Sequence, residues 1–87
     1  MSSVAMRQMR ACIEACKQRL ACVEKQREVP SGIPEYLAAL ESSINDTSPE
    51  LLTSSISLIG KVFMALGLSA DESCAELNRI LQRELRR

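Results

Sequence analysis

The chain has 87 residues, of which 46% are hydrophobic and 25% are charged, values that fit a folded globular protein and exclude a disordered one. Its 11 basic and 11 acidic residues cancel, so no net field would draw the chain to nucleic acid or to an anionic membrane. We expect a single helical domain, residues 1–87, whose thin core favours oligomerisation.

The N-terminal residues show no signal-peptide pattern, because Arg7 and Arg10 interrupt the region where an apolar segment would lie. The most apolar stretch, residues 56–66, contains Lys61 and is shorter than the roughly 20 residues that a membrane span requires. The sequence therefore predicts a cytoplasmic protein with no membrane segment. Its four cysteines would remain thiols in that reducing compartment.

The first predicted helix spans residues 3–28 and carries an apolar seam at heptad spacing. Steps of three and four residues connect seven positions, six of which are apolar. These positions are Met6, Met9, Ile13, Cys16, Leu20, Val23 and Arg27. At about 1.5 Å per residue the helix would be about 39 Å long, longer than any other helix that the sequence predicts. We therefore expect a coiled-coil-like helix whose seam the rest of one chain cannot cover.

A connection at residues 29–33 separates this helix from a second one that starts at Pro34. Pro30 cannot continue a helix, and it disfavours helical geometry in the residue before it. Pro34 suits the first helical position, and Glu35 interacts favourably with the helix dipole there. The expected helix is short and amphipathic. Its apolar face consists of Ile33, Tyr36, Leu37, Leu40 and Ile44.

The third predicted helix spans residues 49–66 and has two candidate N-terminal caps. Thr47 could cap it in a capping box with Glu50, or Ser48 could cap it alone. Beyond the first turn Lys61 is the only charged residue, and apolar residues cover about half of the helix circumference. Such a helix is expected to be buried on more than one side.

The fourth predicted helix starts after Gly67, which can take the left-handed conformation that ends the preceding helix. Ser69 is expected to cap the new helix in a capping box with Glu72, and Glu76 is expected to pair with Arg79 on the outer face. The expected core-facing seam is Ala70, Cys74, Leu77, Leu81 and Leu85. Together the four segments predict an all-α fold, a small four-helix bundle or array with a long N-terminal coiled-coil-like helix.

The sequence offers little that could carry catalysis or bind a cofactor. It has no histidine, which excludes serine–histidine, cysteine–histidine and histidine–metal sites. No closely spaced cysteine pair of the zinc-binding kind occurs, so Cys12, Cys16 and Cys74 are expected to pack in the core. Cys22 lies off the seam, at its margin or in solvent. We therefore predict no enzyme activity, no cofactor and no metal.

The function that the sequence favours is protein–protein interaction without catalysis. We expect an adaptor, chaperone, antagonist or immunity-type binder that forms a homodimer. The seam of the first helix would be the interface, which assigns that role to Met6, Met9, Ile13, Cys16, Leu20, Val23 and Arg27.

Two other functional classes remain open. A DNA-binding transcriptional regulator could use the third and fourth helices, with the turn at Gly67 and a basic C-terminal tail as its signals. Asp71 and Glu72 at the start of the fourth helix would repel phosphates, so nucleic acid is the less favoured partner. The third class is a self-assembling structural subunit.

Overall fold

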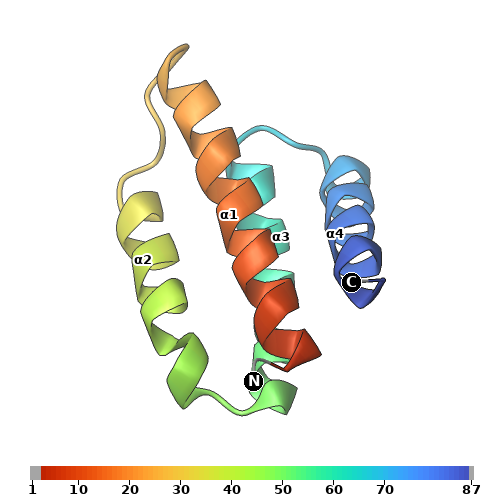
Figure 1. Ribbon diagram of the computed structural model, residues 1–87. Helices are drawn as coiled ribbons and strands as arrows, with labels where there is room; N and C mark the ends of the chain where they lie inside the picture. Colours follow the sequence, from red (N-terminus) through yellow and green to blue (C-terminus); the bar gives the residue numbers. More distant parts are fainter. Residues whose placement is uncertain (1–2, 87) are drawn as a thin grey trace.

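The computed structural model describes residues 3–86, and this part of the chain forms four α-helices without strands. The helices are α1 (Val4–Glu24), α2 (Ile33–Ser43), α3 (Pro49–Ala65) and α4 (Ala70–Leu85), with a short 3₁₀ helix, η1 (Ile44–Asp46), after α2. Figure 1 shows α1 in the centre, α2 and α4 on either side of it and α3 behind. The predicted small all-α bundle is therefore confirmed. None of the helices in residues 3–86 is long and apolar enough to cross a membrane.

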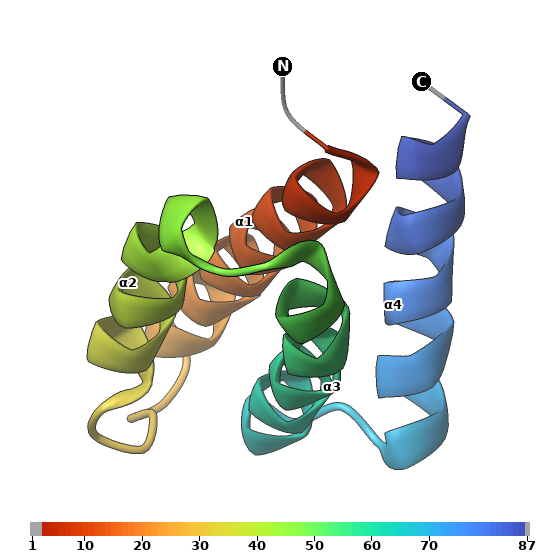
Figure 2. The ribbon, with the colours of Figure 1, turned by 90° about the horizontal axis from the view of Figure 1, so that it is seen from below.

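Helix α1 is the hub of the bundle, since it packs against α2, α3 and α4. Seen from below in Figure 2, α2 and α4 lie on opposite sides of the α1 and α3 pair. Every helix contributes apolar side chains to one core. Its most deeply buried members are Met9, Cys12, Ile13, Cys16, Leu37, Ile44, Leu52, Ile59, Phe63, Leu66 and Ile80.

Helix α1 is shorter than the sequence predicts, because it ends at Glu24 rather than at residue 28. Residues 25–28 are all exposed, so no buried apolar contact stabilises a further helical turn there. Its 21 residues make a helix about 32 Å long. The chain then turns back and covers the seam with α2, α3 and α4, so the expectation that part of the seam stays uncovered is wrong.

The two joints around α3 use the local signals that the sequence contains. Ser48, the second of the two candidate caps, caps α3 by accepting a hydrogen bond from the Leu51 amide. Thr47 donates its hydroxyl to the Ser43 carbonyl instead. At the other end Gly67 adopts φ 106°, and its amide donates to the Met64 carbonyl at 3.0 Å. This left-handed glycine reverses the chain between α3 and α4.

Helix α4 has the predicted N-terminus. The Glu72 amide donates to the Ser69 hydroxyl at 3.1 Å, and the Ser69 amide donates to the Glu72 carboxylate at 2.8 Å. This reciprocal pair is the expected capping box, and it satisfies two amides that the helix itself cannot pair.

The rotation of α4 about its axis differs from the prediction. The residues that face the core are Ser73, Ile80 and Glu84. In the predicted seam Leu77 and Leu81 are half-buried, whereas the other three members are exposed, namely Ala70, Cys74 and Leu85. The apolar seam of α4 therefore lies at the edge of the core.

Gly60 of α3 explains this rotation. The Ser73 hydroxyl donates to the Gly60 carbonyl at 2.8 Å. A Cβ atom on Gly60 would lie 3.1 Å from Leu77 Cδ1 and 3.3 Å from Ser73 Oγ. The missing side chain thus allows α4 to approach α3 at Ser73, which turns Cys74 and Leu85 outward.

Candidate functional site

The predicted interface residues of α1 lie mostly inside the chain's own core. Met6 is partly buried and Arg27 is exposed. The other five are at most 8% exposed, namely Met9, Ile13, Cys16, Leu20 and Val23. A partner could reach these five only if the helices that cover them moved away. The accessible surfaces for a partner are found elsewhere in the fold.

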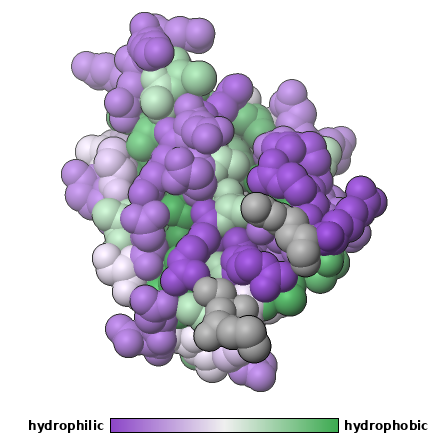
Figure 3. All heavy atoms as spheres, viewed as in Figure 1, coloured by the Kyte–Doolittle hydropathy of each residue, from purple (hydrophilic) through white to green (hydrophobic). Residues whose placement is uncertain are grey.

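A groove of about 1530 Å³ lies between α1 and α4, and we refer to it as the α1–α4 groove. These two helices supply fourteen of its seventeen lining residues. Its floor is made of small or apolar side chains, Ala11, Ala15, Phe63, Leu68 and Ala75. Figure 3 shows this weakly hydrophobic strip between the hydrophilic side chains of α1 and those of α4. A floor rich in alanine lets a second backbone come close.

The rims of the α1–α4 groove alternate in charge, with five arginines and five glutamates. On the α4 rim Arg79 forms an ion pair with Glu76, and the hydrogen bond from Arg79 lowers the pKa of that carboxyl. Further along, Arg83 Nε lies 3.6 Å from a carboxylate oxygen of the buried Glu84. Much of the α4 rim is therefore neutralised within the helix.

The α1 rim differs, because Arg7 and Arg19 have no carboxylate within ion-pair distance among residues 3–86. Arg7 Nε is buried and has no hydrogen-bond partner in the part of the chain that the structure describes. An unpaired buried donor of this kind costs roughly 1–3 kcal/mol. The two arginines are twelve residues apart, or about 18 Å along α1.

The four thiols fall into two classes. Cys12 and Cys16 are buried, and desolvation raises the pKa of Cys12 to about 11 and that of Cys16 to about 12. Cys22 is exposed in the α1–α4 groove. Cys74 is exposed as well, so its predicted place in the core is wrong. Among residues 3–86 no three cysteine or carboxylate side chains come together in a way that could hold a metal ion.

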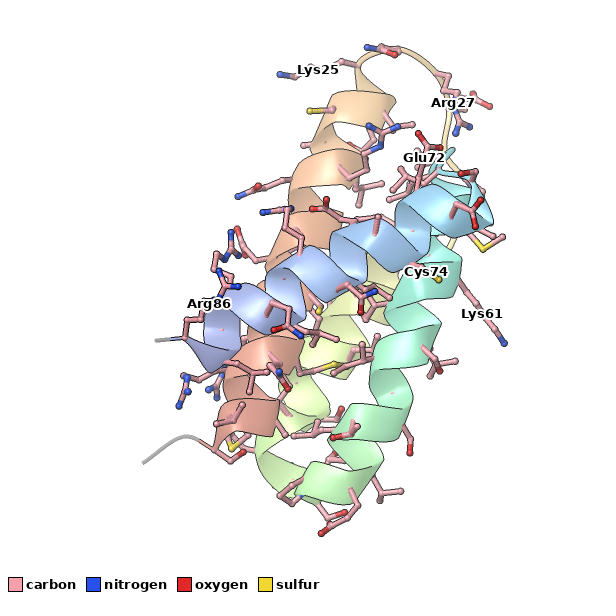
Figure 4. The ribbon with its side chains drawn as sticks, turned by 90° about the vertical axis from the view of Figure 1, so that its right-hand side faces the viewer. Lys25, Arg27, Lys61, Glu72, Cys74 and Arg86 are labelled. Carbon is pink, nitrogen blue, oxygen red and sulfur yellow. The ribbon has the colours of Figure 1, made fainter. Side chains whose placement is uncertain are left out.

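A second surface lies on the other edge of α4. Thr53, Ser57 and Met64 share one face of α3 with Gly60, which contacts α4. We call the uncharged residues on these two faces the α3–α4 face, and they are Thr53, Ser57 and Met64 of α3 with Cys74, Asn78, Leu81 and Leu85 of α4. None of these seven side chains is charged. Figure 4 shows Cys74 on the edge of α4 that faces α3 and Glu72 on the opposite edge.

Comparison with known proteins adds no family to this description. No protein-family model matches the chain, and neither a curated protein nor a solved structure matches it. The two surfaces must therefore be interpreted from their own chemistry.

Sequence reasoning missed both surfaces for identifiable reasons. The groove depends on Ala11 and Ala15, two alanines one helical turn apart on the flank of α1, and alanine is common in cores and on surfaces alike. The α3–α4 face depends on the rotation of α4, which Gly60 sets from another helix. The one signal available beforehand was the lack of charge between Glu50 and Lys61 in α3.

Proposed function

We propose that the protein is a non-catalytic interaction module whose α1–α4 groove receives an amphipathic helix of a partner protein. The observation that carries this proposal is the alanine-rich floor between two charged rims. Helices pack at interaxial distances of about 8–10 Å, and the shortest distances need small side chains at the contact. Ala11, Ala15 and Ala75 meet that need on both walls of the groove.

The charges of the groove suggest what the partner helix carries. Arg7 and Arg19 on the α1 rim form no ion pair within 4 Å among residues 3–86, although the Arg19 charge helps to lower the pKa of Glu72, so acidic side chains about 18 Å apart on the partner would pair with the two arginines. Small or apolar residues would occupy the turns in between, against the alanine floor. A partner helix of about four turns satisfies both conditions.

The pKa shifts of two groove glutamates and of the two buried thiols support a role without catalysis. A general acid at neutral pH needs a carboxyl with a raised pKa. Here hydrogen bonds from Ser69 lower the pKa of Glu72, and the hydrogen bond from Arg79 lowers that of Glu76. The pKa values of Cys12 and Cys16 are raised, so these thiols stay protonated and weakly nucleophilic at neutral pH.

A displayed library of helical peptides tests the proposal. Peptides selected on the wild-type protein should bind roughly ten-fold or more weakly to Ala15→Arg, because the arginine fills the groove floor. Ala38→Arg is the matched control, since Ala38 is exposed on α2 and outside the groove. Circular dichroism would establish that both variants fold. The proposal fails if the library yields no binder, or if Ala15→Arg binds the selected peptides as well as the control does.

A charge test sharpens the result. Arg7→Glu and Arg19→Glu should each weaken the binding of selected peptides that carry acidic residues at the matching spacing. The loss of affinity should be larger at low salt than at high salt. If both variants bound these peptides at low salt as tightly as the wild-type protein does, the proposed orientation of the partner helix would be contradicted.

A further inference from the structure

We propose that the helix bound in the α1–α4 groove carries acidic side chains in its N-terminal half and basic side chains in its C-terminal half, and that it lies antiparallel to α4. This inference rests on the proposed function and adds to it the charge order and the direction of the partner helix. Both follow from how charge is distributed along the groove.

The two helical walls of the groove run in opposite directions. The side-chain amide of Gln8 in α1 donates to the Leu81 carbonyl of α4 at 3.3 Å. Further along α1, Arg19 Nη2 lies 3.9 Å from the position that a Cβ atom on Gly67 would occupy, just before α4 begins. The start of α1 and the end of α4 therefore lie at the same end of the groove, as Figure 1 shows.

The two ends of the groove carry opposite charge. At the end where α1 starts, four arginines and one glutamate line the groove and give a net charge of +3, namely Arg7, Arg10, Arg79, Arg83 and Glu84. At the end where α4 starts, three glutamates and one arginine give a net charge of −2, namely Glu14, Glu72, Glu76 and Arg19. Leaving out the ion pair of Arg79 with Glu76 gives +2 and −1, so the order is unchanged. The groove is therefore basic at one end and acidic at the other.

A helix with acidic residues first and basic residues last fits this groove in one direction. Acidic side chains in the first turns and basic side chains in the last turns also stabilise the helix itself, because they oppose the charges of the helix dipole. Such a helix complements the groove when its N-terminal half lies beside Arg7 and Arg83. It then runs parallel to α1 and antiparallel to α4. The acidic residue proposed to pair with Arg19 is the one exception in its basic half.

The reverse charge order is less favourable. A helix with basic residues first would complement the groove only in the opposite direction. Its charges would then act against its own dipole, at a cost of about 0.3–1 kcal/mol at each end. We therefore expect selected peptides to be acidic first.

A paramagnetic label on a peptide tests the direction. The probe is a synthetic helix of about sixteen residues with alanine and leucine on the side that faces the groove floor. It has glutamates in its first two turns and lysines in its last two, apart from the glutamate meant for Arg19. A nitroxide at its N-terminus should broaden the amide signals of Gln8 and Leu81 more than those of Cys22 and Leu68. A nitroxide at its C-terminus should give the opposite pattern.

A second peptide tests the charge order. It has the same composition and net charge, but its glutamates and lysines alternate along the same positions. We expect it to bind roughly ten-fold more weakly than the acidic-first peptide, because unlike charges no longer meet at both ends of the groove.

Glu14 provides a test from the side of the protein. It is exposed, lines the acidic end of the groove and forms no ion pair among residues 3–86. Glu14→Lys should raise the Kd of the acidic-first peptide about three-fold. Replacing the peptide's late lysines with glutamate one at a time should recover that loss at one position. Glu24→Lys, an exposed reversal of α1 outside the groove, is the matched control and should leave the Kd unchanged.

The outcomes separate this inference from the proposed function. Stronger broadening of Cys22 and Leu68 by the N-terminal label, equal Kd values for the two peptides, or an unchanged Kd in Glu14→Lys would overturn the inference and leave the groove as a binding site. If no helical peptide bound, or if a second copy of the chain occupied the groove in the absence of peptide, the proposed function and this inference would both be wrong.

Discussion

Five of the six α4 residues that line the α1–α4 groove are charged, whereas none of the four α4 residues of the α3–α4 face is charged. Both edges share one helix of 16 residues, so side-chain order alone creates the difference. Glu72, Glu76 and Arg83 fall on one edge at steps of four and seven residues. A short helix can therefore carry two unrelated surfaces once a third stripe of side chains packs it against the core.

The largest loss of stability is expected from substitutions in the stripe of α4 that faces the core. Ile80 is fully buried, so Ile80→Ala should lower the free energy of unfolding by about 2–5 kcal/mol. Leu85→Ala, on the exposed edge, should change it by less than about 0.5 kcal/mol. Urea denaturation followed by circular dichroism measures both. The reverse order of effects would mean that α4 sits in the rotation that its apolar seam predicts.

Gly60 should show the next largest effect, because it sets which edge of α4 faces outward. Gly60→Val should cost about 1–3 kcal/mol, since the branched side chain would overlap Leu77 and Ser73. Gly60→Ala should be much milder, because the gain of about 1 kcal/mol in helix propensity offsets the tight Cβ contact. Urea denaturation of the two variants separates the cost of side-chain overlap from the gain in helix propensity. Equal stability of wild type and Gly60→Val would contradict the close approach of α3 and α4.

A smaller loss is expected at the start of α4, where the charged edge begins. Ser69→Ala removes the capping hydroxyl and should lower the free energy of unfolding by about 1 kcal/mol, measured by thermal unfolding.

The stabilisation that this capping box provides should also decrease at low pH. The pKa of Glu72 is lowered in the folded state, so its contribution is complete above the usual value of 4.5 and is lost as the pH falls through the folded value. Glu72→Gln should show a shallower loss of stability below pH 4.5 than the wild type.

The smallest effect on stability should come from the exposed thiols, Cys22 of α1 in the groove and Cys74 of α4 on the α3–α4 face. Alkylation at pH 8 should modify Cys22 and Cys74 and change the free energy of unfolding by less than about 0.5 kcal/mol. Cys12 and Cys16 should react only after denaturation, because burial raises their pKa values to about 11 and about 12. Mass spectrometry counts the modified sites. Rapid modification of all four thiols in the folded protein would contradict the packing of α1.

Local signals predicted most of the fold. The prolines placed the starts of α2 and α3, Gly67 placed the turn before α4, and Ser69 with Glu72 placed the start of that helix. Each of these signals acts within a few residues of where it is found, so a sequence is enough to interpret it. The four helices and the core face of α1 followed from the same kind of pattern.

The remaining features depend on contacts between distant residues. Helix α4 presents Ser73 to the core, rather than Cys74, because Gly60 lies opposite, thirteen residues earlier in the chain. The α1 seam is covered because α2, α3 and α4 all pack on α1. No periodicity in the sequence predicts either arrangement. The two candidate surfaces are hard to predict for the same reason, since they consist of the residues that the packing of the helices leaves exposed.

One measurement tests most directly the claim that the two edges of α4 have different roles. In ¹H–¹⁵N spectra recorded with and without a selected helical peptide, we expect the shifts to centre on the amides beside the groove floor, led by Ala11, Ala15 and Ala75. The amides of Cys74, Asn78 and Leu85 on the α3–α4 face should not shift. Shifts that map to the α3–α4 face or to the buried seam of α1 would contradict the proposed groove.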